Sequence, residues 1–194
     1  MNIQKFTQKS IEAVNGCEKV AVDYGNQEIE QEHLLYALMT IEDSLIARLV
    51  EKMGIDKDVF ISRIEEAIRK RTKVQGGNPY IGPDLNKAFI SAEDEAKALG
   101  DEYVSVEHLF LSVIRHPNRE VKEILKAFGI DRNRFLQVLS EVRGNRNVTT
   151  DNPEATYDTL NKYGTELVEK ARRQKLDPVI GRDTEIRNVI SQTQ

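Results

Sequence analysis

The sequence has little of the chemistry that stabilises a small protein or equips a reactive site. Cys17 is the only cysteine among 194 residues, so no intrachain disulfide can form and a reducing compartment suits the chain. Tryptophan is absent, and aromatic residues make up only 6% of the sequence. No apolar run approaches the roughly 20 residues of a membrane helix, and no apolar segment of a signal peptide follows Met1. We therefore expect a soluble, cytoplasmic protein with no membrane partner.

Neither sign of charge dominates the sequence. Lysine and arginine number 28 against 32 aspartates and glutamates, which gives a net charge of -4. Nucleic-acid binding usually requires a basic surface, so we expect no nucleic-acid partner. A local basic cluster at the end of a helical segment is better explained by the negative end of a helix dipole; it comprises Lys170, Arg172, Arg173 and Lys175.

The chain also lacks a Gly-x-x-x-x-Gly-Lys-Ser/Thr loop, whose backbone N–H groups bind nucleotide phosphates. Without this loop we expect neither ATP binding nor ATP hydrolysis by these 194 residues. The sequence contains no Ser/His/Asp or Cys/His pattern with supporting context, so we predict that this chain is not an enzyme and holds no cofactor.

What the sequence does contain is a repeat. Glu32-His33-Leu34-Leu35 recurs 75 positions later as Glu107-His108-Leu109-Phe110, and Gly54-Ile55-Asp56 recurs as Gly129-Ile130-Asp131. The same offset aligns both halves without a gap, and internal repeats decide the architecture before any local pattern does. We predict an all-α fold of eight helices in two four-helix units. Duplication also argues against an enzyme, because an active site usually needs one asymmetric cluster.

Apolar residues at helical spacing, with capping residues and glycine stops, predict where the helices lie. For the first unit we expect helices over 7–24, 31–40 and 44–53, then a helix that Asp56 caps, with Val59, Phe60, Ile64 and Ile68 on its apolar face. For the second unit we expect helices over 84–99, from Ser105 to before Pro117, from Asn118 to Gly129, and over 131–142.

Composition divides the chain into three parts. Residues 1–144 are predicted to form the repeat domain, with repeat one at about 4–71, repeat two at about 79–144 and a glycine- and proline-rich connection at 72–83. Residues 145–157 are polar with no apolar period, which is typical of a flexible linker. We expect a helix over 157–174, then a turn and a short helix that the chain end interrupts, so residues 158–194 are predicted to be the truncated start of a further domain.

These residues resemble a known family. The Glu-His-Leu and Gly-Ile-Asp motifs resemble the Clp N-terminal repeat. The string Leu176-Asp177-Pro178-Val179-Ile180-Gly181-Arg182-Asp183 is similar to the start of the first AAA+ ATPase domain of Clp unfoldases. Leu160-Asn161-Lys162-Tyr163-Gly164 is most similar to the ClpB disaggregase type.

This resemblance implies a substrate-recruiting N-terminal domain of an ATP-dependent disaggregase or unfoldase chaperone. It would bind exposed apolar segments of unfolded or aggregated proteins weakly and pass them to the AAA+ ring. The full-length protein would be a homo-hexamer that uses ATP and magnesium, contains a coiled-coil insertion and cooperates with an Hsp70-type chaperone, while this fragment would be monomeric. The alternative is an adaptor-docking N-domain of a ClpC- or ClpA-like unfoldase that feeds a protease.

The family's substrate groove maps onto four positions of this sequence. Thr7, Phe89, Asp101 and Glu107 are the residues that the resemblance implies for substrate binding. Each also has a purely structural explanation: Thr7 as a helix cap, Phe89 as a core residue, and Glu107 as an acid at a helix N-terminus. This chain departs from the family at three further groove positions, where polar Ser91, Glu95 and His108 predict a smaller or more polar groove.

Two other groups of residues invite a functional role. In the full-length protein, Val179 and Ile180 would lie on the adenine side of a bound nucleotide. His33 and His108 suggest a metal site, but duplication alone produces equivalent histidines on different units, so we expect no metal. Cys17 aligns with Ala92, which indicates a small core position and a structural role.

Overall fold

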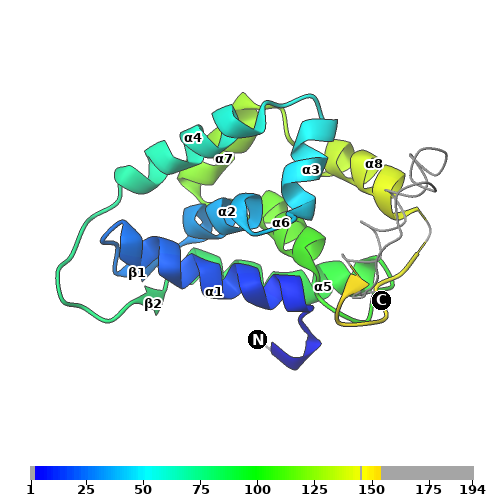
Figure 1. Ribbon diagram of the computed structural model, residues 1–194, viewed down its shortest axis with the longest axis horizontal. Helices are drawn as coiled ribbons and strands as arrows, with labels where there is room; N and C mark the ends of the chain where they lie inside the picture. The colour runs from blue at the N-terminus through cyan, green and yellow to red at the C-terminus, as the bar shows by residue number, and fades with distance from the viewer. Residues whose placement is uncertain (1–2, 145, 154–194) are drawn as a thin grey trace, which may run out of the picture. The chain divides into compact units, whose positions relative to one another are not determined.

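The computed structural model describes residues 3–144 and 146–153, and this part of the chain is predominantly helical (Figure 1). A 3₁₀ turn, η1 (Ile3–Lys5), precedes the first helix, and two short strands, β1 (Glu28–Ile29) and β2 (Tyr80–Ile81), form a two-stranded parallel sheet. The α-helices are α1 (Gln8–Asp23), α2 (Gln31–Thr40), α3 (Leu45–Lys52), α4 (Lys57–Arg69), α5 (Pro83–Ala98), α6 (Val106–Arg115), α7 (Arg119–Ala127) and α8 (Arg132–Arg143).

The helix boundaries confirm the duplication. Adding 75 to the ends of α1 gives the ends of α5, and adding 75 to the ends of α2 gives the ends of α6. The pairs α3/α7 and α4/α8 differ by one residue at a single end. The predicted all-α double repeat is therefore confirmed.

Local sequence signals explain where these helices start and stop. Gly54 and Gly129 end their helices with positive φ angles of 82° and 66°, a conformation that glycine adopts without steric cost. At the other end, side chains of the N-cap residues accept hydrogen bonds from first-turn N–H groups. Caps of this kind are Thr7, Ser44, Asp56, Asn118 and Asp131.

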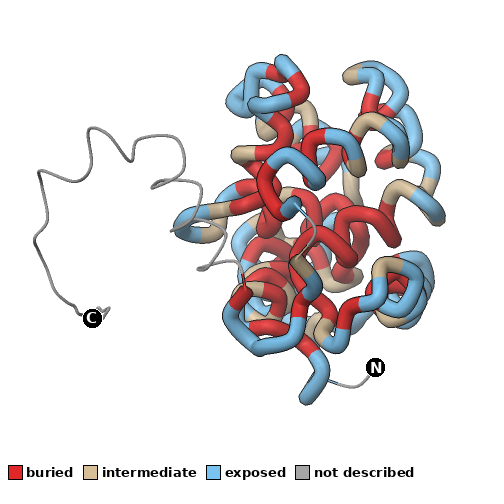
Figure 2. Tube along the Cα trace, turned by 90° about the vertical axis from the view of Figure 1, so that its right-hand side faces the viewer, coloured by how far each residue is buried: buried red, intermediate tan, exposed pale blue. Residues whose placement is uncertain are grey.

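Helices α2 and α6 form the centre of the domain. Helices α1 and α5 lie on one side of this pair, and α3, α4, α7 and α8 lie on the other (Figure 1). Nearly every residue of α2 and α6 is buried, and Figure 2 shows buried residues, in red, gathered at the centre of the domain. Helix α4 contacts α7, and α3 contacts α8, so the two repeats interlock around one shared core.

The repeats also exchange short extended segments. Ile29, which precedes α2, pairs with Ile81, which precedes α5. In the second repeat Val104, which precedes α6, pairs in parallel with Phe6, which precedes α1. Each repeat thus completes its pairing with the segment that leads into the other repeat, and this reciprocal exchange ties the two units together.

The beginning of the predicted flexible linker differs from the expectation. Residues 146–153 pack against the domain and belong to the same compact unit as the eight helices. The side chain of Val148 is fully buried. The backbone carbonyl oxygen of Val148 accepts a hydrogen bond from Glu102 N–H at 2.8 Å. The one apolar side chain in this polar stretch anchors it, so the ordered domain extends past Gly144.

One inward-facing prediction was wrong. Val59 is 53% exposed, whereas Phe60, Ile64 and Ile68 on the same helix are fully buried. Successive residues of an α-helix lie about 100° apart, which places Val59 away from the direction that Phe60, Ile64 and Ile68 share. The helical segment expected at 157–174 lies outside the described residues.

Candidate functional site

Two carboxylates that sequence reasoning assigned to substrate binding lie together in the second repeat. Asp101 follows the last turn of α5, and Glu107 lies in the first turn of α6. Both side chains are fully buried. The guanidinium of Arg143, at the end of α8, bridges them by donating to Asp101 Oδ1 and, at 3.4 Å, to Glu107 Oε2. One arginine of the same domain therefore pairs with both acids.

Asp101 makes further hydrogen bonds that use both of its oxygens. His108 Nε2 donates to Oδ2 at 2.6 Å, and the backbone N–H of Val148 donates to Oδ1 at 2.9 Å. Burial alone would raise the pKa of Asp101, but the hydrogen bonds from His108, Val148 and Arg143 outweigh it and hold this pKa below its ordinary value. The carboxylate is thus ionised and fully engaged within the domain.

Thr7 lies close to the loop between α5 and α6, which carries Asp101, and Phe89 lies in the core. The hydroxyl of Thr7 caps α1 by accepting from Ser10 N–H at 3.2 Å, and its backbone N–H donates to Val104 O at 2.9 Å. Phe89 is 1% exposed on α5. The structure therefore gathers Thr7, Asp101 and Glu107 around residues 101–107. All four side chains are buried, so their proposed contact with substrate would require a rearrangement, and it stays a prediction.

The polar groove residues noted in the sequence are also buried. Ser91 is 7% exposed and Glu95 is 2% exposed. Glu95 accepts from Arg115 Nε at 2.5 Å and from Arg132 Nη1 at 2.6 Å, which joins α5 to α6 and α8. Its charge is paired within the domain, so Glu95 holds helices together and does not line a polar groove.

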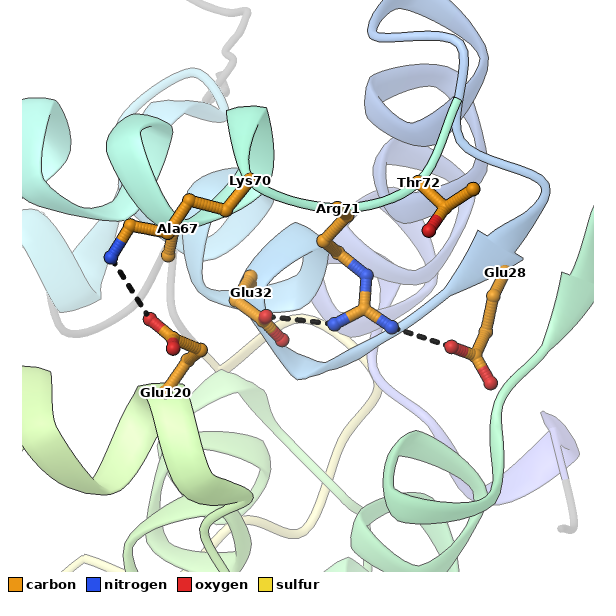
Figure 3. A pocket seen from close by; sticks show the side chains of 7 residues that line it. All are labelled: Glu28, Glu32, Ala67, Lys70, Arg71, Thr72 and Glu120. Atoms are coloured by element: carbon orange, nitrogen blue, oxygen red, sulfur yellow. Dashed lines mark hydrogen bonds and ion pairs between the residues drawn. The ribbon is translucent and has the colours of Figure 1, made fainter. Parts of the chain in front are cut away.

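The first repeat carries an equivalent arrangement with different chemistry. Asn26 takes the place of Asp101, and its Oδ1 lies 3.0 Å from His33 Nε2. Arg71 donates to Glu28 at 2.5 Å and to Glu32 at 2.9 Å, as Figure 3 shows. A depression of about 290 Å³ lies beside this arginine, and its lining comprises Glu28, Glu32, Ala67, Lys70, Arg71, Thr72 and Glu120.

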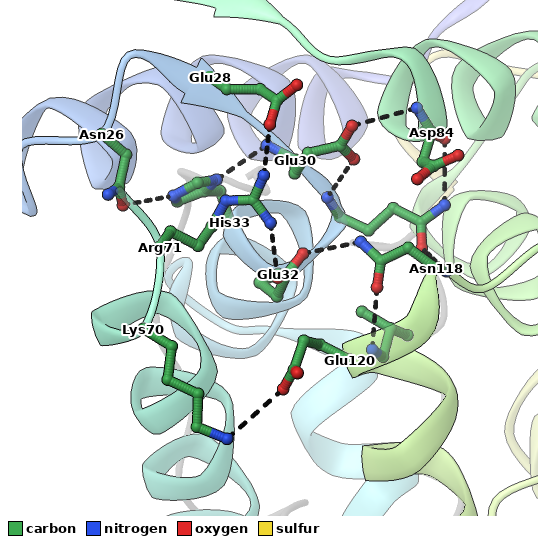
Figure 4. A network of polar contacts seen from close by, with 12 residues as sticks. Asn26, Glu28, Glu30, Glu32, His33, Lys70, Arg71, Asp84, Asn118 and Glu120 are labelled. Carbon is green, nitrogen blue, oxygen red and sulfur yellow. Dashed lines mark hydrogen bonds and ion pairs between the residues drawn. The ribbon is translucent and has the colours of Figure 1, made fainter. Parts of the chain in front are cut away.

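A polar network next to this depression joins the two repeats (Figure 4). Buried Gln31 donates to Asp84 O at 3.0 Å and to His116 O at 2.9 Å, and it accepts from Asn118 N–H at 2.8 Å. Asn118 also donates to Glu32 at 2.8 Å. Each of these side chains bonds to the other repeat, so the network fixes the repeats relative to each other.

The two motif histidines are capping residues. The backbone N–H groups of Glu30 and Ser105 donate to Nδ1 of His33 and His108, each at 2.8 Å. In this arrangement His33 is neutral, with its proton on Nε2 facing Asn26. Burial lowers the pKa of His33 to about 4, and burial raises the pKa of the neighbouring Glu30 to about 7.

The histidines and the cysteine therefore have structural explanations. Within residues 3–144 and 146–153, no group of three or more His, Cys, Asp or Glu side chains could hold a metal ion. Cys17 is buried, and burial raises the pKa of its thiol, which makes the reactive thiolate scarce. Val179 and Ile180, the positions implied for adenine, lie outside the described residues.

Comparison with known proteins identifies the family. Residues 5–128 match the family described as the Clp repeat (R) N-terminal domain. The chain belongs to the Clp repeat N-terminal domain family. The chaperone protein ClpB of Nitratidesulfovibrio vulgaris is 44% identical over 98% of this chain, and the match covers 23% of that protein. The resemblance to ClpB-type chaperones is thereby confirmed, and the chain spans about a quarter of the length of such relatives.

Solved Clp N-domains share the fold at lower identity. The Hsp104 N-terminal domain from Candida albicans has a TM-score of 0.67 and 18% identity, with 76% of this chain and 97% of that chain covered. A ClpV N-domain in complex with a VipB peptide has a TM-score of 0.57 and 20% identity, with 72% and 89% covered. No helix of residues 3–144 or 146–153 has the length and apolar character to cross a membrane.

Sequence reasoning missed two residues of this Clp N-domain that hold the carboxylate pair. Arg143 had no visible role because its partners lie 36 and 42 positions earlier in the chain. Val148 was the one signal available, since it is the only apolar residue between Gly144 and Pro153. A lone apolar residue in a polar stretch carries no periodicity, but it can anchor the stretch.

Proposed function

We propose that this Clp N-domain recruits protein substrates for an ATP-dependent disaggregase. The observation that carries this proposal is the match to a ClpB chaperone along 98% of the chain at 44% identity. In this function the domain weakly binds exposed apolar segments of unfolded or aggregated proteins and passes them to the AAA+ ring. The cytoplasm is the expected location.

The surface of the domain offers apolar contacts for such a role. Tyr80 and Ile81 on β2 are 51% and 44% exposed, and Ile90 on α5 is 52% exposed. Tyr80 and Ile81 are adjacent, and exposed apolar residues that lie together are typical of interaction sites. A domain of this fold has been solved with a bound peptide, the ClpV N-domain with the VipB peptide. We infer that the exposed side chains on β2 and on α5 make the first contact with a substrate, and that buried Phe89 does not.

Weak binding is the physical expectation for this surface. A small contact area that accepts many sequences gives a dissociation constant of about micromolar rather than nanomolar. A flexible tether compensates, because it keeps a bound substrate near the ring at an effective concentration on the order of millimolar. Recruitment therefore needs no tight binding by the N-domain itself.

The properties of the full-length protein belong to the same proposal. It would assemble as a homo-hexamer, bind ATP and magnesium in its ATPase domains, with Val179 and Ile180 near the adenine, and work with an Hsp70-type chaperone. In the alternative, a ClpC- or ClpA-like parent would use this domain to dock a folded adaptor for a protease. The ClpB relatives favour the disaggregase.

Deleting residues 1–153 from the full-length protein tests the proposed function. We expect several-fold lower recovery of some aggregated substrates, because their recruitment is lost, while basal ATP hydrolysis stays close to that of the intact protein. Parallel assays of refolding yield and phosphate release measure the two effects. An equal loss of both activities would mean that the domain supports the ring itself and does not recruit substrates.

A further inference from the structure

Residues 146–151 lie along the loop that carries the candidate carboxylate Asp101. Val148 N–H donates to Asp101 Oδ1 at 2.9 Å, and Val148 O accepts from Glu102 N–H at 2.8 Å. The Val148 side chain is fully buried. Further along, Asp151 O accepts from Gln8 N–H at 2.7 Å. The chain's own extended segment therefore uses hydrogen-bonding groups of this loop and of the start of α1.

The contacts that Val148 makes with this loop are of a general kind. One backbone N–H meets a carboxylate, one backbone C=O meets a backbone N–H, and one small apolar side chain is buried. Any extended peptide with a small apolar residue could reproduce all three, because only the apolar side chain is specific. The residues that accept Val148 thus form a site for an extended polypeptide.

The first repeat shows that a buried apolar residue is not required by the fold. Lys73 is the repeat-one counterpart of Val148, and it pairs with Asn26, the counterpart of Asp101. Lys73 is exposed. Residues 72–82 are also fixed at both ends, by α4 and by α5, whereas residues 146–153 follow the last helix of the domain. Departure of the second segment from its loop therefore breaks no connection between two described helices.

We propose that an extended substrate segment with a small apolar residue displaces residues 146–151 and pairs with Asp101 and Glu102 in their place. This inference rests on the proposed function and gives it a mode of binding. The substrate would add as a strand at the loop, and its arrival would free the start of the linker. Residues 145–153 span up to about 30 Å when extended, so a domain that holds substrate would gain reach toward the ring.

Hydrogen exchange of the 194-residue chain tests the displacement directly. The probe is a permanently unfolded protein, reduced and carboxymethylated α-lactalbumin, added at saturating concentration. Exchange of the Val148 amide should accelerate at least about tenfold as its bond to Asp101 is lost, while the Glu102 amide stays protected by the substrate carbonyl. Bound substrate with unchanged exchange at Val148 would overturn the displacement and leave recruitment intact. An absence of binding would overturn the proposed function and this inference together.

Substitution provides an independent test. Val148→Asp removes the buried anchor and weakens the internal competitor, so the fraction of domains with an open site rises. We expect the unfolded protein to bind this variant about tenfold more tightly. Val74→Asp is the matched control, since Val74 is 43% exposed in the first-repeat segment, and its affinity should equal that of the original chain. A folded Val148→Asp variant with unchanged affinity would contradict displacement.

Discussion

Replacing Arg143 with alanine should lower the free energy of unfolding of the domain by about 3–5 kcal/mol, the range observed when one partner of a buried ion pair is removed. Arg143 is 6% exposed and bridges two fully buried carboxylates. Without it Asp101 keeps its bonds to His108 and Val148, but Glu107 loses the guanidinium. Glu107 Oε1 already lacks a hydrogen-bond partner in the part of the chain described. Urea unfolding at pH 7 measures the change.

Arg71→Ala is the matched control, because Arg71 holds the corresponding glutamate of the first repeat. Its side chain is 22% exposed, and its partner Glu28 is 36% exposed, so solvent screens much of this interaction. Glu32 also keeps its hydrogen bond from Asn118. We expect Arg71→Ala to destabilise the domain less than Arg143→Ala. Equal effects would mean that burial of the second-repeat carboxylates adds nothing to the interaction.

Acidification from pH 6.5 to 4 should remove about 3 kcal/mol of stability through His33 alone. The pKa of this fully buried histidine is lowered from 6.5 to about 4 by burial, and each unit of pKa shift corresponds to about 1.4 kcal/mol. In this window the unfolded chain binds the proton and the folded chain does not, so stability rises with pH. The contribution is fully present above pH 6.5 and is lost as the pH falls toward 4.

His33→Gln isolates this effect from other titrating groups. Glutamine can accept from Glu30 N–H and donate to Asn26, but it takes up no proton. A comparison is needed because Glu30, with its pKa raised to about 7, contributes in the opposite sense and loses its stabilisation as the pH rises from 4.5. The stability of the variant should fall less than that of the original chain between pH 6.5 and 4. Parallel pH profiles would show that His33 titrates normally in the folded domain.

The sequence was sufficient for the architecture because the duplication repeats its local signals. Thr7, Ser44 and Asp131 carry capping side chains. Each helix is also predicted twice, once in each repeat, so the two predictions can be compared. Val59 shows the limit of this reasoning, since it belongs to the same apolar run as buried Phe60 but lies about 100° away around the helix and is exposed.

The candidate site could be located by resemblance but not described. Carboxylates are rarely buried unless they are paired. From the sequence alone, Asp101 and Glu107 would therefore be expected at the surface, because their pairing with Arg143 is not visible there. That partner comes from another helix, and nothing local in the sequence connects the three. The contact of Val148 with the loop could not be predicted either, because Val148 and Asp101 lie 47 positions apart. A pairing of single residues from distant segments leaves no periodic pattern in the sequence.

Binding of an unfolded protein to this chain tests the central claim most directly. Fluorescence anisotropy of labelled, carboxymethylated α-lactalbumin would be measured against increasing concentrations of the 194-residue chain, with the native, folded form as the control. We predict saturable binding of the unfolded form with a dissociation constant of about micromolar, and no binding of the folded form. Equal binding of both forms, or no binding of the unfolded form at concentrations approaching millimolar, would contradict a substrate-recruiting domain.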